Sequence, residues 1–174
     1  MDSKLVTAFN RHLELEFNAF YKYMAMSHWL DQNDLPGFAQ WMANQSTEEL
    51  EHATKFIEHM LERDVQPVLP AVAAPGTDWG SVLDLVTAVY NSECEVTRAI
   101  GDLYELAEKA GDRPAQVLLQ WFVSEQVEEE NMAKSMLGRL RLADGSGVGL
   151  LMIDQELSQG RIGGALPTET GGQQ

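Results

Sequence analysis

Cysteine is almost absent from this sequence, because Cys94 is the only one among its 174 residues. A single thiol excludes an intrachain disulfide, and it excludes a zinc or iron–sulfur site built from several cysteines of one chain. Long apolar runs are absent too, since no stretch approaches the roughly 20 residues that span a bilayer. The N-terminal segment is interrupted by polar and charged residues, unlike a secretory signal. We therefore expect a cytoplasmic protein without membrane contact, unless a transit peptide once preceded Met1.

Basic residues are also scarce: 12 Lys and Arg stand against 27 Asp and Glu, which gives a formal net charge of -15. Such a surface repels phosphate backbones and anionic membranes and attracts cations. We therefore expect neither a nucleic-acid partner nor a membrane partner. Net charge alone is equally compatible with a role in solubility. With 44% hydrophobic and 22% charged residues, the composition is that of a folded globular protein.

Proline and glycine are concentrated in a few short segments, at 34–37, 65–80, 111–114 and 145–147. Because these residues interrupt helices, the intervals between them predict four long helices and a short fifth, over 4–33, 37–63, 81–110, 114–142 and 148–159. Ser81 is suited to cap the third helix and Gly111 to end it. We expect one helical domain over 1–160 and a flexible tail, rich in Gly, Thr and Gln, over 161–174.

The lengths of the connections predict how these helices are arranged. The first and third connections are short, so each joins antiparallel neighbours. The second, of about 17 residues, is long enough to run the length of a bundle and to join helices that point the same way. The sequence therefore predicts an all-α protein, a four-helix bundle with one long crossover connection and a short fifth helix.

Apolar side chains recur at alternating steps of three and four along each predicted helix, which is the spacing of a packed bundle. Carboxylates interrupt each of these stripes, at Glu49 in the second helix and Glu93 in the third. In the first helix the stripe comprises Val6, Phe9, Leu13, Glu16, Phe20 and Tyr23. In the fourth it comprises Leu118, Phe122, Glu125, Glu129, Met132 and Met136.

Four of the interrupting carboxylates stand at matched heights. Each lies within about two residues of the middle of its predicted helix, so at about 1.5 Å of rise per residue they share one level to within about 3–4 Å. His52 follows Glu49 by three residues and therefore points from the same helical face. The pattern predicts that one imidazole and four carboxylates meet at the bundle centre: His52 with Glu16, Glu49, Glu93 and Glu129.

Buried carboxylates placed together repel one another and are costly to desolvate, so a positive charge must compensate. No Lys or Arg occupies the middle of any stripe, and carboxylate oxygens with one imidazole suit iron or manganese better than structural zinc. We expect one metal at Glu16, Glu49 and His52. A second would lie at Glu49, Glu93 and Glu129, with Glu49 bridging. Because Met132 replaces a histidine three residues after Glu129, the second metal has all-oxygen and looser ligation.

These residues resemble the non-haem ferritins of bacteria and cyanobacteria over about 5–160. The resemblance is carried by Leu-Glu-Phe at 15–17 with Tyr23, Glu-Glu-Leu-Glu-His at 48–52, Glu93, Trp-Phe-Val-Ser-Glu-Gln-Val-Glu-Glu-Glu at 121–130, and Leu-Leu-Met-Ile-Asp-Gln-Glu-Leu at 150–157. It implies an iron-storage protein that oxidises Fe(II) with O2 or H2O2 at a di-iron ferroxidase centre. The ferric mineral would be stored inside a homo-oligomeric shell of 24 subunits.

The resemblance also assigns roles to particular residues. The ferroxidase centre would comprise Glu16, Glu49, His52, Glu93 and Glu129, with Gln126 as the polar residue beside it. A third iron site would comprise Glu48, Glu125 and Glu128, with Glu129 shared. Tyr23 would take part in electron transfer during oxidation, although a core tyrosine with a satisfied hydroxyl is equally compatible with its position. Met132 in place of histidine implies a ferritin rather than a bacterioferritin, and no methionine is assigned to haem.

Two other functions remain open at this point. A di-iron oxidase or peroxidase related to the rubrerythrins would use the same ligands, although rubredoxin-type cysteines are lacking and the short fifth helix is ferritin-like. A purely structural bundle with hydrated, metal-free acids would also explain the charges. Outside the candidate ligands, His12, His28 and His59 could coordinate iron, but we expect them at boundary or surface positions. We expect Cys94 to be an inert thiol beside the stripe.

Overall fold

A computed structural model describes residues 1–163 of the chain and gives them five helices and no strand. The helices are α1 (Ser3–Gln32), α2 (Pro36–Leu61), α3 (Val82–Lys109), α4 (Arg113–Ala143) and α5 (Gly147–Ser158). The all-α class is confirmed, and so are the five predicted helices, whose ends lie within two residues of those expected. Most of the predicted tail, from residue 164 onward, lies outside the described residues. Within the described part, no helix combines the length and the apolar character needed to cross a membrane.

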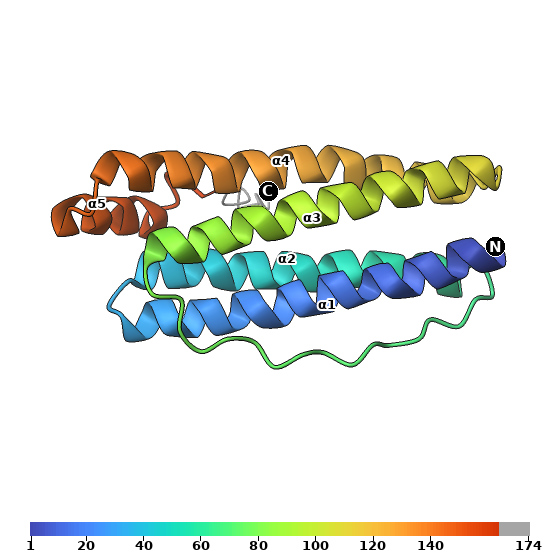
Figure 1. Ribbon diagram of the computed structural model, residues 1–174, viewed down its shortest axis with the longest axis horizontal. Coiled ribbons are helices and arrows are strands. Elements are labelled where there is room, and N and C mark those ends of the chain that lie inside the picture. Colours follow the sequence, from blue (N-terminus) through green and yellow to red (C-terminus); the bar gives the residue numbers. More distant parts are fainter. Residues whose placement is uncertain (164–174) are drawn as a thin grey trace, which may run out of the picture.

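The helices form two antiparallel pairs, α1 with α2 and α3 with α4, and α2 runs in the same direction as α3 (Figure 1). The segment 62–81 joins them by running the length of the bundle alongside α1, as the predicted crossover requires. Two asparagines of α1 form hydrogen bonds with the backbone of this crossover segment. Asn10 Oδ1 accepts from the Val68 N–H at 2.7 Å, and Asn18 Oδ1 accepts from the Ala73 N–H at 3.1 Å.

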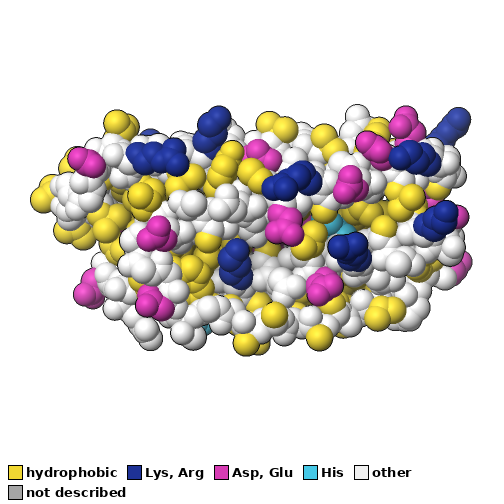
Figure 2. All heavy atoms as spheres, in the orientation of Figure 1, with side chains coloured by type: hydrophobic (Ala, Val, Ile, Leu, Met, Phe, Trp, Pro, Cys, Tyr) yellow, Lys and Arg dark blue, Asp and Glu magenta, His cyan; other side chains and the backbone are white. Residues whose placement is uncertain are grey.

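Two apolar clusters fill the ends of the bundle and leave its middle to polar groups. One cluster contains Tyr23 and Phe38, and the other contains Phe9 and Phe122. Along each long helix the buried glutamate comes between residues of the two clusters, as Glu16 does between Leu13 and Ala19. On the face seen in Figure 2, acidic and basic side chains are interspersed. Glu16, Glu49, Glu93 and Glu129, by contrast, are buried inside the bundle.

The predicted stripes are correct for α2 and α3 but wrong in part for α1 and α4. In α1, Val6 and Phe20 are only half-buried, whereas His12 is buried. In α4, the predicted positions Leu118, Glu125 and Met132 are half-buried, and the residues that follow them are buried instead: Leu119, Gln126 and Ala133. The reason is that a helix facing two neighbours buries a face wider than one strict three-four stripe.

Both predicted ends of α3 are confirmed. The Ser81 hydroxyl accepts a hydrogen bond from the Asp84 N–H at 3.1 Å, which is the expected N-cap. Gly111 has a φ of 66°, the left-handed conformation that glycine adopts most readily after a helix.

The start of α2 is capped by a residue from α5. Leu35 has no capping side chain, and the buried carboxylate of Asp154 accepts the Phe38 N–H at 2.9 Å instead. The two helices approach so closely at Gly37 that a Cβ there would lie 1.9 Å from the Asp154 carbonyl oxygen. Glycine at position 37 therefore allows α5 to dock on α2.

We expect Gly37→Ala to push α5 away from α2 and to break the Asp154 cap. The loss should be about 1–3 kcal/mol of unfolding free energy, the usual cost of overpacking. Urea denaturation of both proteins measures it. Gly138→Ala is the matched control, because Gly138 is an exposed helical glycine with open space around it. It should stabilise the protein slightly, and equal effects of the two substitutions would contradict this account of the α2–α5 contact.

Candidate metal centre

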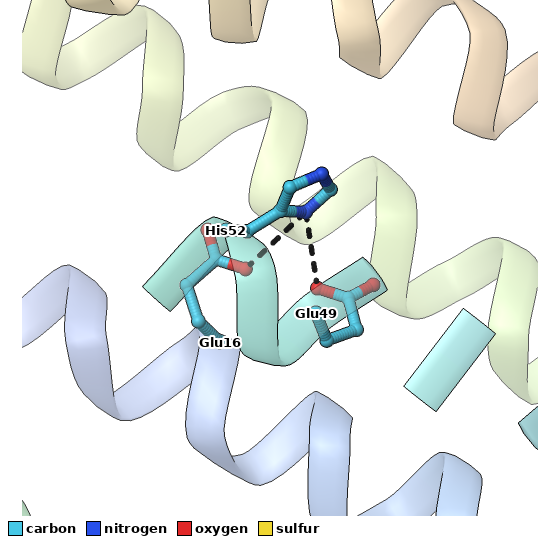
Figure 3. Close-up of side chains that lie close together, drawn as sticks. All are labelled: Glu16, Glu49 and His52. Atoms are coloured by element: carbon cyan, nitrogen blue, oxygen red, sulfur yellow. Dashed lines mark ion pairs between the residues drawn. The ribbon is translucent and has the colours of Figure 1, made fainter. Parts of the chain in front are cut away.

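Three of the predicted ligands converge at the middle of the bundle. Glu16 comes from α1, and Glu49 and His52 come from adjacent turns of α2 (Figure 3). His52 Nδ1 lies 3.5 Å from Glu49 Oε2 and 3.9 Å from Glu16 Oε2. All three side chains are buried, and each offers a ligand atom within 4.8 Å of the other two. This is the geometry of a site that a metal ion could occupy.

A second group of possible ligands differs from the predicted one. His52, Glu125 and Glu129 also bring ligand atoms within 4.8 Å of one another. The expected second set was Glu49, Glu93 and Glu129, and Glu125 was assigned to a third site. Glu129 thus lies close to Glu125 and His52, and the charge of Glu93 also acts on it.

Glu93 is held by hydrogen bonds to side chains of two other helices. It is buried, and its two carboxylate oxygens accept from different donors: Oε1 from the Tyr23 hydroxyl, and Oε2 from Gln126 Nε2 at 3.3 Å. Tyr23 is thus a core tyrosine with a satisfied hydroxyl, and it also touches a predicted ligand directly. Gln126, which the resemblance assigned to a position beside the centre, donates to the same carboxylate.

Burial, helped by neighbouring charges, raises the pKa values of three glutamates of this cluster. Burial, reinforced by the charges of Glu93 and Glu16, raises the pKa of Glu49 well above the ordinary value. Burial also raises the pKa of Glu93 to about 7, although the hydrogen bonds from Tyr23 and Gln126 oppose the shift. For Glu129, burial and then the charges of Glu93 and Glu48 raise the pKa to about 9. A carboxyl group with a raised pKa keeps its proton to a higher pH, and an incoming cation can displace that proton.

Glu16 is the exception, because a buried histidine stands beside it. Burial would raise the pKa of Glu16, but the hydrogen bond and the charge of His12, together with smaller effects of Glu49 and His52, lower it. His12 Nε2 lies 2.6 Å from Glu16 Oε1, and the His12 side chain is 2% exposed. The expectation that His12 lies at the boundary or surface is therefore wrong. The four-residue spacing from Glu16, which places both side chains on one helical face, was the signal that could have revealed it.

The residues assigned to a third iron site lie around one cavity. Glu48, Glu125, Glu128 and Glu129 line a space of about 420 Å³ beside α2 and α4. Burial raises the pKa of Glu48, and burial with the charge of Glu128 raises that of Glu125. Because Glu129 belongs to this cavity and to the buried cluster, carboxylates extend continuously from the centre of the bundle into the cavity.

An aromatic cluster packs against His52 and His12. The rings of His52 and Phe122 have centroids 5.5 Å apart, and Phe122 stacks on Phe56 at 4.5 Å. Phe56 in turn packs against His12 at 4.6 Å. Trp121 adds an edge contact to His52 at 5.7 Å. The two imidazoles of the centre are therefore held by one continuous group of aromatic side chains.

Comparison with known proteins agrees with this architecture. Residues 6–143 match the ferritin family, as a ferritin-like domain. This chain belongs to the ferritin family. The ferritin of Pacifastacus leniusculus is 36% identical over 86% of this chain and 85% of its own length. The bacterial non-heme ferritin of Escherichia coli O157:H7 is 32% identical over 89% of this chain and 94% of its own length. The expected resemblance to bacterial non-haem ferritins is confirmed.

Solved structures also support the assignment of this chain to the ferritin family. The open pore ferritin of the archaeon Archaeoglobus fulgidus superposes with a TM-score of 0.89 and 39% sequence identity. The match covers 91% of this chain and 98% of the archaeal chain. The predicted ferritin-like bundle with its short fifth helix is thereby confirmed.

The raised pKa values predict that the metal-free ferritin loses stability as the pH rises. In the unfolded chain, glutamates release their protons near the ordinary carboxyl pKa of 4.5. In the folded protein, Glu93 keeps its proton up to about pH 7 and Glu129 up to about pH 9. Raising the pH through this window therefore favours unfolding. We expect the thermal midpoint to fall from about pH 5 to about pH 9, as followed by circular dichroism.

Glu129→Gln should reduce this fall, because it removes one of the titrating groups. The exposed Glu58 of α2 provides the control, since Glu58→Gln should leave the pH dependence unchanged. A Glu129→Gln protein whose midpoint falls as steeply as that of the wild type would contradict the assignment of the high pKa to Glu129.

Proposed function

We propose that this ferritin stores iron, and that it oxidises Fe(II) to Fe(III) at a di-iron centre formed by Glu16, Glu49, His52, Glu93 and Glu129. The observation that carries the proposal is the position of these side chains. They come from all four long helices, and they are buried between two apolar clusters in a chain of the ferritin family. Ferroxidase activity is the known activity of this family.

The ligand types suit this reaction. Hard carboxylate oxygens stabilise Fe(III) more than Fe(II), so they lower the potential and favour oxidation. Two Fe(II) ions supply two electrons, the number that converts O2 and two protons into H2O2, or H2O2 and two protons into two water molecules. The protons held by Glu49, Glu93 and Glu129 would leave when cations bind.

The two metal positions would differ in whether their ligands must give up a hydrogen bond before a metal binds. Glu16, Glu49 and His52 already surround the first position. The second, at Glu49, Glu93 and Glu129, requires Glu93 to exchange a hydrogen bond with Tyr23 or Gln126 for the metal. Because this arrangement binds the second Fe(II) less firmly, iron would pass through the second position rather than stay there.

Iron would leave the centre through the adjoining carboxylates. Glu125 lies close to His52 and Glu129, and it also lines the cavity with Glu48 and Glu128. These four glutamates would form the third iron site, between the di-iron centre and the mineral. Tyr23, which donates a hydrogen bond to Glu93, would supply an electron during oxidation.

The assembly and the cofactors complete the proposal. The mineral would form inside a shell of 24 copies of this chain, in the cytoplasm, without haem. The oxidant would be O2 or H2O2, and the acidic excess of the chain would draw Fe(II) inward.

Aerobic titration of the metal-free protein with Fe(II) tests storage. We expect Fe(III) absorbance to grow without light scattering, far beyond three iron ions per chain, and the iron to co-elute with a very large particle on a sizing column. Oxidation that stops near two or three iron ions per chain, on a small oligomer, would instead assign the centre to a dedicated oxidase.

Substitution of Glu49 tests the centre itself. Glu49→Gln removes the bridging carboxylate while keeping its size, so the initial rate of Fe(II) oxidation should fall about 10-fold to 100-fold or more. Stopped-flow absorbance measures the rate, with Glu58→Gln as the control on the exposed side of α2. A Glu49→Gln protein that is more stable than the wild type and oxidises iron equally fast would identify a purely structural bundle.

A further inference from the structure

His12 makes one directed contact with the centre that the predicted ligand set leaves unexplained. It stands four residues before Glu16 on α1, and its Nε2 lies 2.6 Å from Glu16 Oε1. A carboxylate oxygen accepts hydrogen bonds, so His12 Nε2–H is the donor. Both side chains are almost fully buried, at 2% and 0% exposure. Water therefore does not compete for this hydrogen bond.

This contact makes the two oxygens of Glu16 different from each other. Oε1 is occupied by His12. Oε2 is buried and accepts no hydrogen bond from the described residues, and it is the oxygen that lies 3.9 Å from His52 Nδ1. Oε2, which has no such partner and lies toward His52, is therefore the oxygen better placed to bind a metal held with Glu49 and His52.

The ring of His12 is fixed by its packing as well as by its hydrogen bond. Phe56 contacts it with ring centroids 4.6 Å apart, and Phe56 stacks on Phe122, which packs against His52. The ligand imidazole of His52 and the imidazole of His12 are thus positioned by the same aromatic side chains. A displaced His12 would also leave Glu16 free to turn.

We propose that His12 is a positioning residue of the metal centre, which holds Glu16 by Oε1 so that this carboxylate binds the first metal through Oε2 alone. The inference rests on the proposed function of the centre. Binding through one oxygen leaves a coordination position of the first metal open to an oxidant or to water. Partners of this kind orient metal ligands, and their loss commonly weakens metal binding about 10-fold to 100-fold.

Co(II) binding to the metal-free protein tests the proposal without any oxidation step. Two variants form a matched pair: His12→Gln keeps a donor that reaches Glu16 across one helical turn, whereas His12→Asn carries the same amide on a side chain too short to reach it. His59→Gln is the control. His59 packs near Phe9 of the same aromatic cluster, but its hydrogen bond is to Arg63.

We expect His12→Asn to weaken binding of the first Co(II) about 10-fold to 100-fold and to change its visible d–d absorption, as Glu16 turns or binds through both oxygens. His12→Gln and His59→Gln should retain the affinity and the spectrum of the wild type. Circular dichroism establishes that each variant is folded.

Several results would overturn the proposal. If His12→Asn binds Co(II) like the wild type, His12 has no positioning role and the proposed function stands. If His12→Gln is as impaired as His12→Asn, the hydrogen bond is not what matters. If the wild type binds no Co(II), the proposed function fails as well. A crystal structure of the Zn(II)-loaded wild type provides a test independent of variant folding, because ligation through Glu16 Oε1 would contradict the proposal.

Discussion

Repulsion among buried carboxylates at the centre of the bundle is the constraint on which the rest of this structure depends. Glu16, Glu49, Glu93 and Glu129 are all nearly inaccessible to water. Several such groups cannot all be ionised in one apolar environment unless cations or hydrogen-bond donors compensate them. The apolar clusters at the two ends of the bundle supply the burial that stabilises the fold and allow its middle to remain acidic.

The compensation is uneven across the centre. On the α1 side, His12 donates to Glu16 and contributes most to lowering its pKa against the effect of burial. On the α3 side, Tyr23 and Gln126 donate to Glu93, yet burial still raises its pKa to about 7. Glu16 on one side of the centre is thus ionised at a lower pH than Glu93 on the other. The proposal that one Fe(II) is bound firmly and the other is passed onward draws on this difference.

Elements far from the centre maintain its geometry. The crossover segment lies against α1 through Asn10 and Asn18, and α5 caps the first turn of α2 through Asp154. These contacts fix the two helices that carry Glu16, Glu49 and His52. Because ligand positions must be correct to a fraction of an ångström, the docking of helix ends bears directly on the chemistry at the middle of the bundle.

The sequence by itself determined the number of helices, their ends, the crossover and the burial of Glu16, Glu49, Glu93 and Glu129 near the helix middles. Those features follow from helix-breaking residues and from a constant rise per residue, both of which are local. The rotation of each helix about its axis was not determined locally, because it depends on how two neighbours share its buried face. Only the tertiary structure therefore placed His12 inside the core, turned Glu93 toward Tyr23 and Gln126, and grouped Glu125 with His52 and Glu129.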